Sequence, residues 1–358
     1  MARVTLPARD VLRTGAILAG IYLALRLLWI GRSLVLLTFL AVLFGLCLSA
    51  GVDRLARWRI PRGAGAALLV LLVLGCLTGL GALVAPRIGK QVSELQDQLP
   101  RAIQDVEQWV ESRYRGVLET IEAPSKKGPG QASPLRQSLT EQVAGLGKHF
   151  FAVFSSTLSV LAGLILILFV AIYVAVDPGL YHGGIMHLFP HRMRKRAGEV
   201  LSEVATLLRR WLLAQLVAML VIGSVTTIVL LALGVHAAIA LGIIAGLLEF
   251  VPYVGPILSA VPAITMGFLS GPQVALAVAV AYTIIQQSEN HLLIPLLMKR
   301  GLDLPPVVTI VSQALMGLVF GLLGLLVAVP LVGAVTVLVK MLYVEDVVGD
   351  DVALPGEA

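Results

Sequence analysis

The stretch Glu249-Phe-Val-Pro-Tyr-Val-Gly-Pro256 decides how the second half of this chain folds, because long uncharged runs lie on both sides of it. Pro252 and Pro256 each remove a backbone hydrogen-bond donor, and Gly255 permits unusual dihedral angles, so the sequence predicts that a helix breaks here. Glu249 places a carboxylate at the same point. The chain therefore brings a broken backbone and a charge together inside an apolar region.

The composition of the whole chain identifies that region as lipid-embedded. Of the 358 residues, 58% are apolar and 13% are charged, and the mean hydropathy is +0.93. Soluble proteins carry about 25% charged residues, so a soluble globular enzyme is excluded. Disorder is excluded as well, because disordered chains combine low hydrophobicity with high net charge. The sequence predicts a membrane protein.

Six uncharged runs indicate the type of the membrane segments. They are 33–52, 63–86, 149–176, 211–248, 250–288 and 304–339. A helix needs about 20 apolar residues to cross a bilayer, so the first three runs, of 20, 24 and 28 residues, each fit one helix. The other three, of 38, 39 and 36 residues, are too long for one helix and should contain turns or re-entrant segments. None alternates as barrel strands do, so the expected fold is an all-α polytopic membrane protein.

The N-terminal part and the basic residues predict the orientation. The first apolar stretch lacks a convincing cleavage site, which favours an uncleaved helix at about 14–31. Short loops rich in arginine lie on the cytoplasmic side of membranes. The connection 53–62 carries four arginines, and a second basic cluster lies at 192–210, after Asp177-Pro178-Gly179 ends the fourth helix. Both clusters agree on a cytoplasmic N-terminus.

The polar segment 87–149 carries nine basic and eight acidic residues, and the parity of the helices places it outside the cytoplasm. Between Val92 and Ile121 its apolar residues recur about every 3.67 residues, which predicts a long amphipathic helix. Two interpretations of this apolar stripe stay open: it packs on another helix, for example from a neighbouring subunit, or it lies on the membrane surface. Residues 123–134 have the composition of a flexible loop.

Polar residues mark two places in the C-terminal half. An intramembrane carboxylate is costly and indicates a pathway or a partnered functional site, so Glu249 is either such a residue or an interfacial one just outside the hydrocarbon. Gln286, Glu289 and Asn290 fall at i, i+3 and i+4 and share one helical face. That face suits a polar solute, a cation or a proton relay, unless the cluster simply ends its helix at the headgroup level. Whether the two glutamates approach each other stays open.

The last long run contains further glycine and proline. Gly317 and Gly321 have the spacing of a close helix-packing face. Alternatively, Gly324 and Pro330 mark a second break that turns the run into a hairpin. Paired broken segments are typical of a transporter binding site.

The sequence favours neither an enzyme nor a cofactor-binding protein. Walker, dinucleotide-binding and metalloprotease motifs are absent. Cys47 and Cys76 lie alone in apolar runs, and His182, His187 and His191 have no carboxylate or cysteine between them. We therefore expect a protein that is not an enzyme and that holds no metal or cofactor.

An ordered set of motifs resembles one known family. It covers 249–331 and comprises Phe250-Val-Pro-Tyr-Val-Gly-Pro256, Pro262, Glu289-Asn290, Pro295-Leu-Leu-Met298, Pro306-Val-Val308 and Gly321-Leu-Leu-Gly-Leu-Leu-Val-Ala-Val-Pro330. This set, with the order of the remaining elements, resembles the autoinducer-2 exporter (AI-2E) family of bacterial inner-membrane transporters. One departure is Lys299-Arg300-Gly301, because the family often has Gly-Lys directly after the methionine.

The resemblance implies about eight transmembrane helices, cytoplasmic N- and C-termini, and a homo-oligomer in the bacterial inner (plasma) membrane. It also implies export of a small polar organic solute like the quorum-sensing signal autoinducer-2, although some relatives instead exchange Na⁺ or Li⁺ for H⁺. The expected partners are a small polar solute or a monovalent cation and proton, together with the lipid bilayer, and not nucleic acid. A non-transporting membrane scaffold, with 87–149 as its binding segment, is a third hypothesis that leaves the helix breaks without a reason.

On this interpretation the chain has five parts. They are N-terminal transmembrane helices one to three (1–86), an extracytoplasmic amphipathic helix and loop (87–149), the fourth transmembrane helix with a cytoplasmic amphipathic segment (150–210), the C-terminal transport-site half (211–343) and an acidic cytoplasmic tail (344–358). The residues expected to line the route are Glu249, Tyr253, Gln286, Glu289 and Asn290. Those expected to form or gate the helix breaks are Pro252, Gly255, Pro256, Pro295, Gly321, Gly324 and Pro330.

Overall fold

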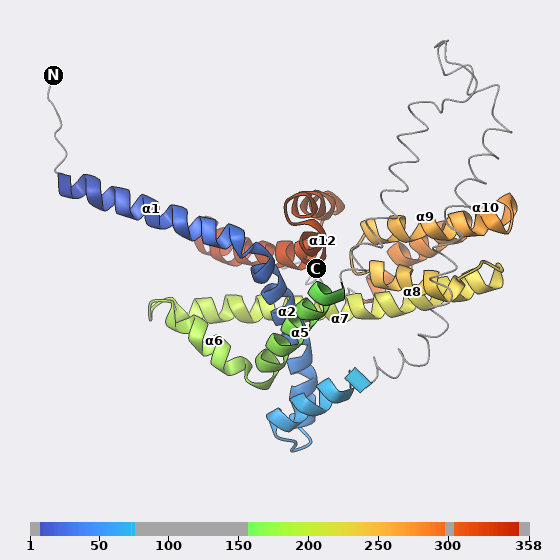
Figure 1. Cartoon of the computed structure of the whole chain (residues 1–358). Coiled ribbons are helices and arrows are strands. Elements are labelled where there is room, and N and C mark those ends of the chain that lie inside the picture. Colours follow the sequence, from blue (N-terminus) through green and yellow to red (C-terminus); the bar gives the residue numbers. More distant parts are fainter. Residues whose placement is uncertain (1–7, 73, 76–156, 298–303, 351–358) are drawn as a thin grey trace, which may run out of the picture.

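The computed structural model describes residues 8–72, 74–75, 157–297 and 304–350, and these residues form helices joined by short turns (Figure 1). The helices are α1 (Ala8–Ile30), α2 (Arg32–Ala56), α5 (Thr157–Val176), α6 (Pro178–His187), α7 (Arg194–Ala232), α8 (Ala238–Leu248), α9 (Val254–Leu269), α10 (Pro272–Ser288), the π-helix η1 (Glu289–Leu293), α11 (Ile294–Leu297), α12 (Pro306–Val339) and the π-helix η2 (Lys340–Val348). A further helix runs over Arg62–Leu72. The predicted amphipathic helix and loop of 87–149, and the turn at 299–301, lie outside the described residues.

Three of the described helices are long and apolar enough to cross a membrane: α2, α7, and α12 together with η2. The pair α5 and α6 makes a fourth if it counts as one span, although the chain bends by 86° between them. At this bend the Asp177 side chain accepts a hydrogen bond from the Leu180 N–H at 3.0 Å and so caps α6. The helix end predicted at Asp177-Pro178-Gly179 is therefore confirmed, as is the all-α polytopic membrane fold. The total of about eight spans stays a prediction.

The first helix begins earlier than predicted. We expected it near residue 14, but α1 begins at Ala8 and ends at Ile30. Only Gly31 separates it from α2. In Figure 1 α1 extends away from the other helices, and near its end the ring of Trp29 lies 6.3 Å from that of Phe320, measured between centroids.

Each of the three overlong runs is broken, as their lengths predicted. The run 211–248 breaks between α7 and α8, 250–288 breaks between α9 and α10, and 304–339 breaks inside α12. A glycine with positive φ lies at each break, and these are Gly234, Gly271 and Gly321. Glycine reaches positive φ without the steric cost that a Cβ imposes, which explains where each run turns.

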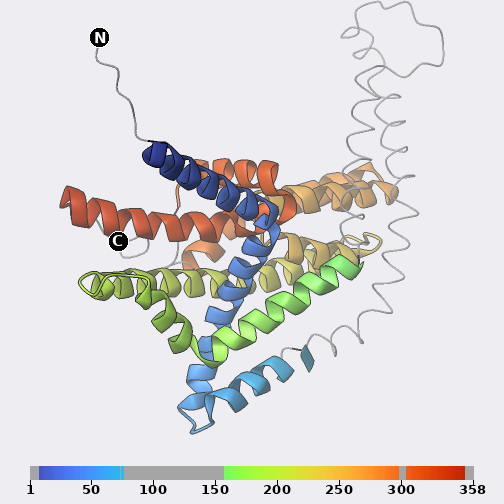
Figure 2. The same cartoon turned by 60° about the vertical axis from the view of Figure 1, so that its left-hand side comes forward.

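The helix α12 is a hairpin of two arms, the first arm (306–320) and the second arm (322–339), which meet at Gly321 with φ 63° and ψ −144°. A Cβ added to Gly317 would lie 2.9 Å from the Leu325 side chain, eight positions further along. Eight residues of straight helix span about 12 Å, so the two arms must fold back on one another, as Figure 2 shows. The hairpin expected for this run is present.

The second break, inside α12, lies close to Gly324 but not at Pro330, although both residues were expected to mark it. Gly324 lies in the second arm, three residues after the turn, where an added Cβ would collide with the backbone of Met316 and lie 2.9 Å from the Cβ of Phe320. Pro330, which we expected to mark the break, instead lies buried inside the second arm. Membrane helices tolerate proline where neighbouring groups satisfy the freed backbone carbonyl. The break falls at Gly321 because its dihedral angles are reached easily only by glycine.

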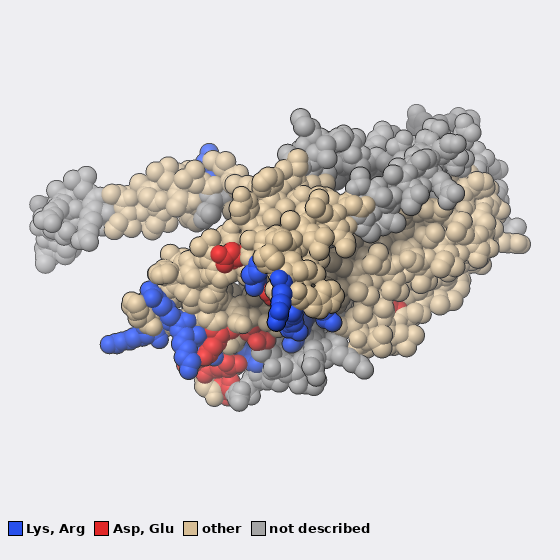
Figure 3. Space-filling model, turned by 90° about the horizontal axis from the view of Figure 1, so that it is seen from below, with Lys and Arg blue, Asp and Glu red and all other residues tan. Residues whose placement is uncertain are grey.

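A hydrophobic cluster joins α2, α7, the turn after α8 and the second arm of α12. In it Trp211, 2% exposed, packs edge-on against Phe250 with 5.8 Å between ring centroids. Leu43 of α2 and Val337 of the second arm are fully buried in the same cluster. On the face of the molecule seen in Figure 3 most charged side chains gather in one region, with single charged groups at the upper edge and at the right, and the rest of the described surface is uncharged, as a lipid-exposed surface requires.

Candidate functional site

The turn of residues 249–253 separates α8 from α9 and forms the break predicted there. A Cβ added to Gly255, the second residue of α9, would collide with the backbone of α8, so only glycine fits at this position. Pro256 lies in the first turn of α9, where its missing N–H has no intrahelical partner to lose. Pro252 and Tyr253 lie within the turn, and Tyr253 is exposed and has a positive φ of 62°.

Glu249 lies at the C-terminal end of α8 and is 2% exposed. Its backbone carbonyl accepts a hydrogen bond of 2.5 Å from the side-chain Nε2 of Gln215, a buried residue of α7. Its side-chain Oε2 has no hydrogen-bond partner among the described residues. The backbone of this residue is therefore fixed to α7, while its carboxyl group retains a free acceptor.

Glu289 lies forty residues further along the chain and begins the π-helix η1 after α10. It is 7% exposed, and its Oε2 accepts a hydrogen bond of 3.1 Å from Nε2 of Gln286. The neighbouring Asn290 is exposed. Pro295 lies in α11, directly after η1, and its missing N–H cannot donate to the preceding turn. Isolated π-turns of this kind occur frequently at functional sites.

The side chains of Glu249 and Glu289 lie within hydrogen-bonding reach of each other. The question that the sequence left open is thus answered, because the break after α8 and the π-turn after α10 bring both carboxyl groups together. A hydrogen bond between two carboxyl groups requires a proton on one of them. The pair can therefore hold and release a proton, and its free oxygen can accept a hydrogen bond or coordinate a cation.

The wall beside this pair is built from α9 and α10. Tyr282 Oη on α10 donates to the backbone carbonyl of Ser259 on α9, at 3.4 Å. Ser259, 2% exposed, donates its own hydroxyl to the Pro256 carbonyl at 3.0 Å. These bonds connect the first turns of α9 to the helix that carries Gln286.

Two buried amide side chains were not predicted from the sequence to be part of the site. Gln215 binds the Glu249 carbonyl, and Gln313 in the first arm of α12 is 1% exposed. Neither side-chain nitrogen nor oxygen of Gln313 has a hydrogen-bond partner among the described residues. Each is the single amide side chain in its uncharged run. The sequence signal that could have identified both residues is an amide side chain isolated among apolar residues.

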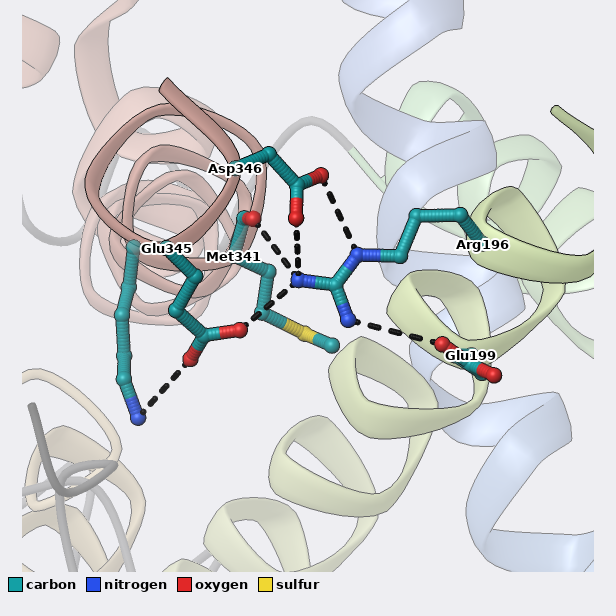
Figure 4. Close-up of polar contacts among 6 residues, drawn as sticks. Arg196, Glu199, Met341, Glu345 and Asp346 are labelled. Atoms are coloured by element: carbon teal, nitrogen blue, oxygen red, sulfur yellow. Dashed lines mark hydrogen bonds and ion pairs between the residues drawn. The ribbon is translucent and has the colours of Figure 1, made fainter. Parts of the chain in front are cut away.

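A second polar cluster lies between the start of α7 and η2 (Figure 4). The guanidinium group of Arg196 contacts the carboxylates of Glu345 at 2.7 Å and Asp346 at 2.8 Å, and Nη2 also donates to the Met341 carbonyl at 2.9 Å. Glu199 lies 3.4 Å away on the same helix. Arg196, counted in the sequence as one charge of a basic cluster, thus connects α7 to the helix after α12.

Comparison with known proteins agrees with this architecture. The family model described as "AI-2E family transporter" matches residues 16–343. The chain is 25% identical to the AI-2 transport protein TqsA of Escherichia coli over 325 residues, which cover 88% of this chain and 87% of TqsA. It is 28% identical to YueF of Bacillus subtilis over 311 residues, covering 84% of each chain, and 25% identical to MT0215 of Mycobacterium tuberculosis over 317 residues, covering 86% and 83%. The protein is a member of the AI-2E family of membrane transporters.

Proposed function

We propose that this protein is a secondary transporter or facilitator that exports a small polar organic solute, similar to autoinducer-2, across the bacterial inner membrane. The observation that carries the proposal is the buried Glu249–Glu289 pair at a break in apolar helices. Polar groups and broken backbone at membrane depth are retained where a polar substrate or ion passes. The relative TqsA is named an AI-2 transport protein, which supports the choice of solute.

The proposed route passes the carboxyl pair and its neighbours. Gln286 and the free Oε2 of Glu249 offer donors and acceptors to a solute, and the exposed Tyr253 and Asn290 extend the polar lining. The breaks on either side allow short helix segments to move without unfolding a whole span. We further propose that both termini face the cytoplasm, because the arginine-rich loops favour that side, and that the protein works as a homo-oligomer.

Efflux of autoinducer-2 from proteoliposomes that contain the purified protein tests this proposal. Glu249→Gln and Glu289→Gln should each slow efflux by about tenfold or more, since each removes a polar interaction of about 1.5–3 kcal/mol. Glu203→Gln, the same change in the charged part of α7, serves as the control and should leave efflux unchanged. Normal efflux in both site variants, with the fold verified by circular dichroism, contradicts the site.

A second function, exchange of Na⁺ or Li⁺ for H⁺, is favoured by the same carboxyl pair. Two carboxyl groups that share a hydrogen bond can release a proton when a cation takes its place. A pH-sensitive dye inside the vesicles should then respond to pulses of NaCl or LiCl, and Glu289→Gln should remove the response. No proton movement in the wild type would exclude this function.

A further inference from the structure

The first arm of α12 has its polar residues inside and its apolar residues outside. Its only buried residues are Thr309, 5% exposed, and Gln313, 1% exposed. Large apolar side chains of the arm point outward instead, and Leu318 is 85% exposed and Val307 71% exposed. Membrane helices bury small residues against their neighbours, and the polar side chains that they bury form hydrogen bonds to other helices. The inward face of this arm is therefore built for polar contact.

The side-chain amide of Gln313 is buried and unpaired in the described structure. Neither its Nε2 nor its Oε1 has a hydrogen-bond partner among the described residues. Leaving a buried amide unpaired costs about 1–3 kcal/mol per group. Gln215 offers a direct comparison, because this equally buried amide donates to the Glu249 carbonyl. The neighbouring Ser312 is likewise satisfied, since its hydroxyl donates to the Thr309 carbonyl at 2.8 Å.

The same helical face reaches the hydrophobic cluster that contains Phe250. Met316 and Phe320 follow Gln313 at the spacing of one face, and both pack against the cluster that contains Trp211 and Phe250. Phe250 is the residue directly after Glu249. The first arm also ends at Gly321, where the hairpin turns. The unpaired amide thus lies on an element that joins the core beside the proposed site and that has a natural hinge.

We propose that Gln313, together with Thr309 one turn before it, contacts the transported solute and recognises its neutral hydroxyl or carbonyl groups. An uncharged amide presents two N–H donors and one carbonyl acceptor, which match a hydroxyl beside a carbonyl. The inference rests on the proposed function and adds its substrate class: a small, neutral, oxygen-rich molecule. The carboxyl pair then binds the proton or cation, and the first arm of α12 binds the solute.

The test is the concentration dependence of autoinducer-2 efflux from proteoliposomes. Gln313→Met keeps the length of the side chain and removes its polar atoms, and it should raise KM by about tenfold. Thermal stability should stay the same or rise, because an unpaired buried amide is removed. Thr309→Val should raise KM several-fold, which gives a second reading if Gln313→Met does not fold. Ser312→Ala, whose hydroxyl is already occupied within the arm, is the matched control and should leave KM unchanged.

The outcomes separate this inference from the proposed function. Wild-type efflux with an unchanged KM in Gln313→Met and Thr309→Val overturns the inference alone. A lower melting temperature with an unchanged KM also overturns it, since that pattern means that the amide is paired inside the folded protein. No autoinducer-2 efflux from the wild type overturns the proposed function, and this inference with it.

Discussion

Nε2 of Gln215 donates a 2.5 Å hydrogen bond to the backbone carbonyl of Glu249, so that α7 fixes the turn after α8. Both residues are buried. Turns within membranes leave backbone groups without helical partners, and a side chain from a neighbouring helix is one of the few ways to satisfy them. The position of the Glu249 carboxyl group therefore depends on a residue in a different helix.

Replacing Gln215 with leucine should destabilise the protein, because the buried Glu249 carbonyl loses its partner. The expected loss is about 1–3 kcal/mol, measured as a lower melting temperature in detergent. Gln287→Leu, the same change at an exposed position of α10, is the control and should have little effect. Equal melting temperatures for the two variants would show that the bond contributes nothing to stability.

Substituting Gly321 with alanine should disturb the hairpin of α12. Its dihedral angles, φ 63° and ψ −144°, are costly for a residue with a Cβ, by about 1–3 kcal/mol. We expect a lower melting temperature and slower efflux. Gly20→Ala is the control, because Gly20 lies inside α1 with nothing within 4 Å of an added Cβ. Gly20→Ala should leave stability unchanged or raise it, by up to about 1 kcal/mol; a neutral Gly321→Ala would refute the hinge.

The contacts of Arg196 with Glu345 and Asp346 should be sensitive to charge. Arg196→Gln should lower the melting temperature by a few degrees, and added salt should reduce the difference from the wild type, because the pairs are partly exposed and are screened. Lys195→Gln, which removes one charge from the neighbouring position, should have a smaller effect. A double-mutant cycle with Glu345→Gln measures the coupling, and strict additivity would mean that the two residues act independently.

The sequence predicted that the long uncharged runs break, but it did not locate every break. Run length alone required that 211–248, 250–288 and 304–339 each turn, and each does. The break at Glu249-Phe-Val-Pro-Tyr-Val-Gly-Pro256 was placed correctly, because its prolines and glycine occur together, and Gly321, where α12 turns, was among the residues expected to form the breaks. At Gly234 and Gly271 a single glycine among many gave no local signal, since glycine also occurs inside membrane helices.

The sequence predicted that Glu249 and Glu289 line one route, but it left open whether their side chains approach each other. Glu249 and Glu289 were recognisable as costly charges within apolar runs, but their contact depends on how α8 to α10 pack, and sequence periodicity does not contain that information. Pro330 was expected to mark a break, because proline breaks isolated helices. It lies instead inside the second arm of α12. The burial of Gln313 depends on the same long-range packing.

The Arg196 cluster has a consequence for how this protein is made. Arg196 is synthesised about 150 residues before Asp346, its partner in the ion pair. During that interval the ribosome synthesises α8 to α12, and the translocon must insert each of these helices into the lipid bilayer. The guanidinium group can meet its carboxylates only after the last of these helices has been inserted. Closure of this cluster therefore follows the insertion of α12, and a cross-link between the two positions on nascent chains would time it.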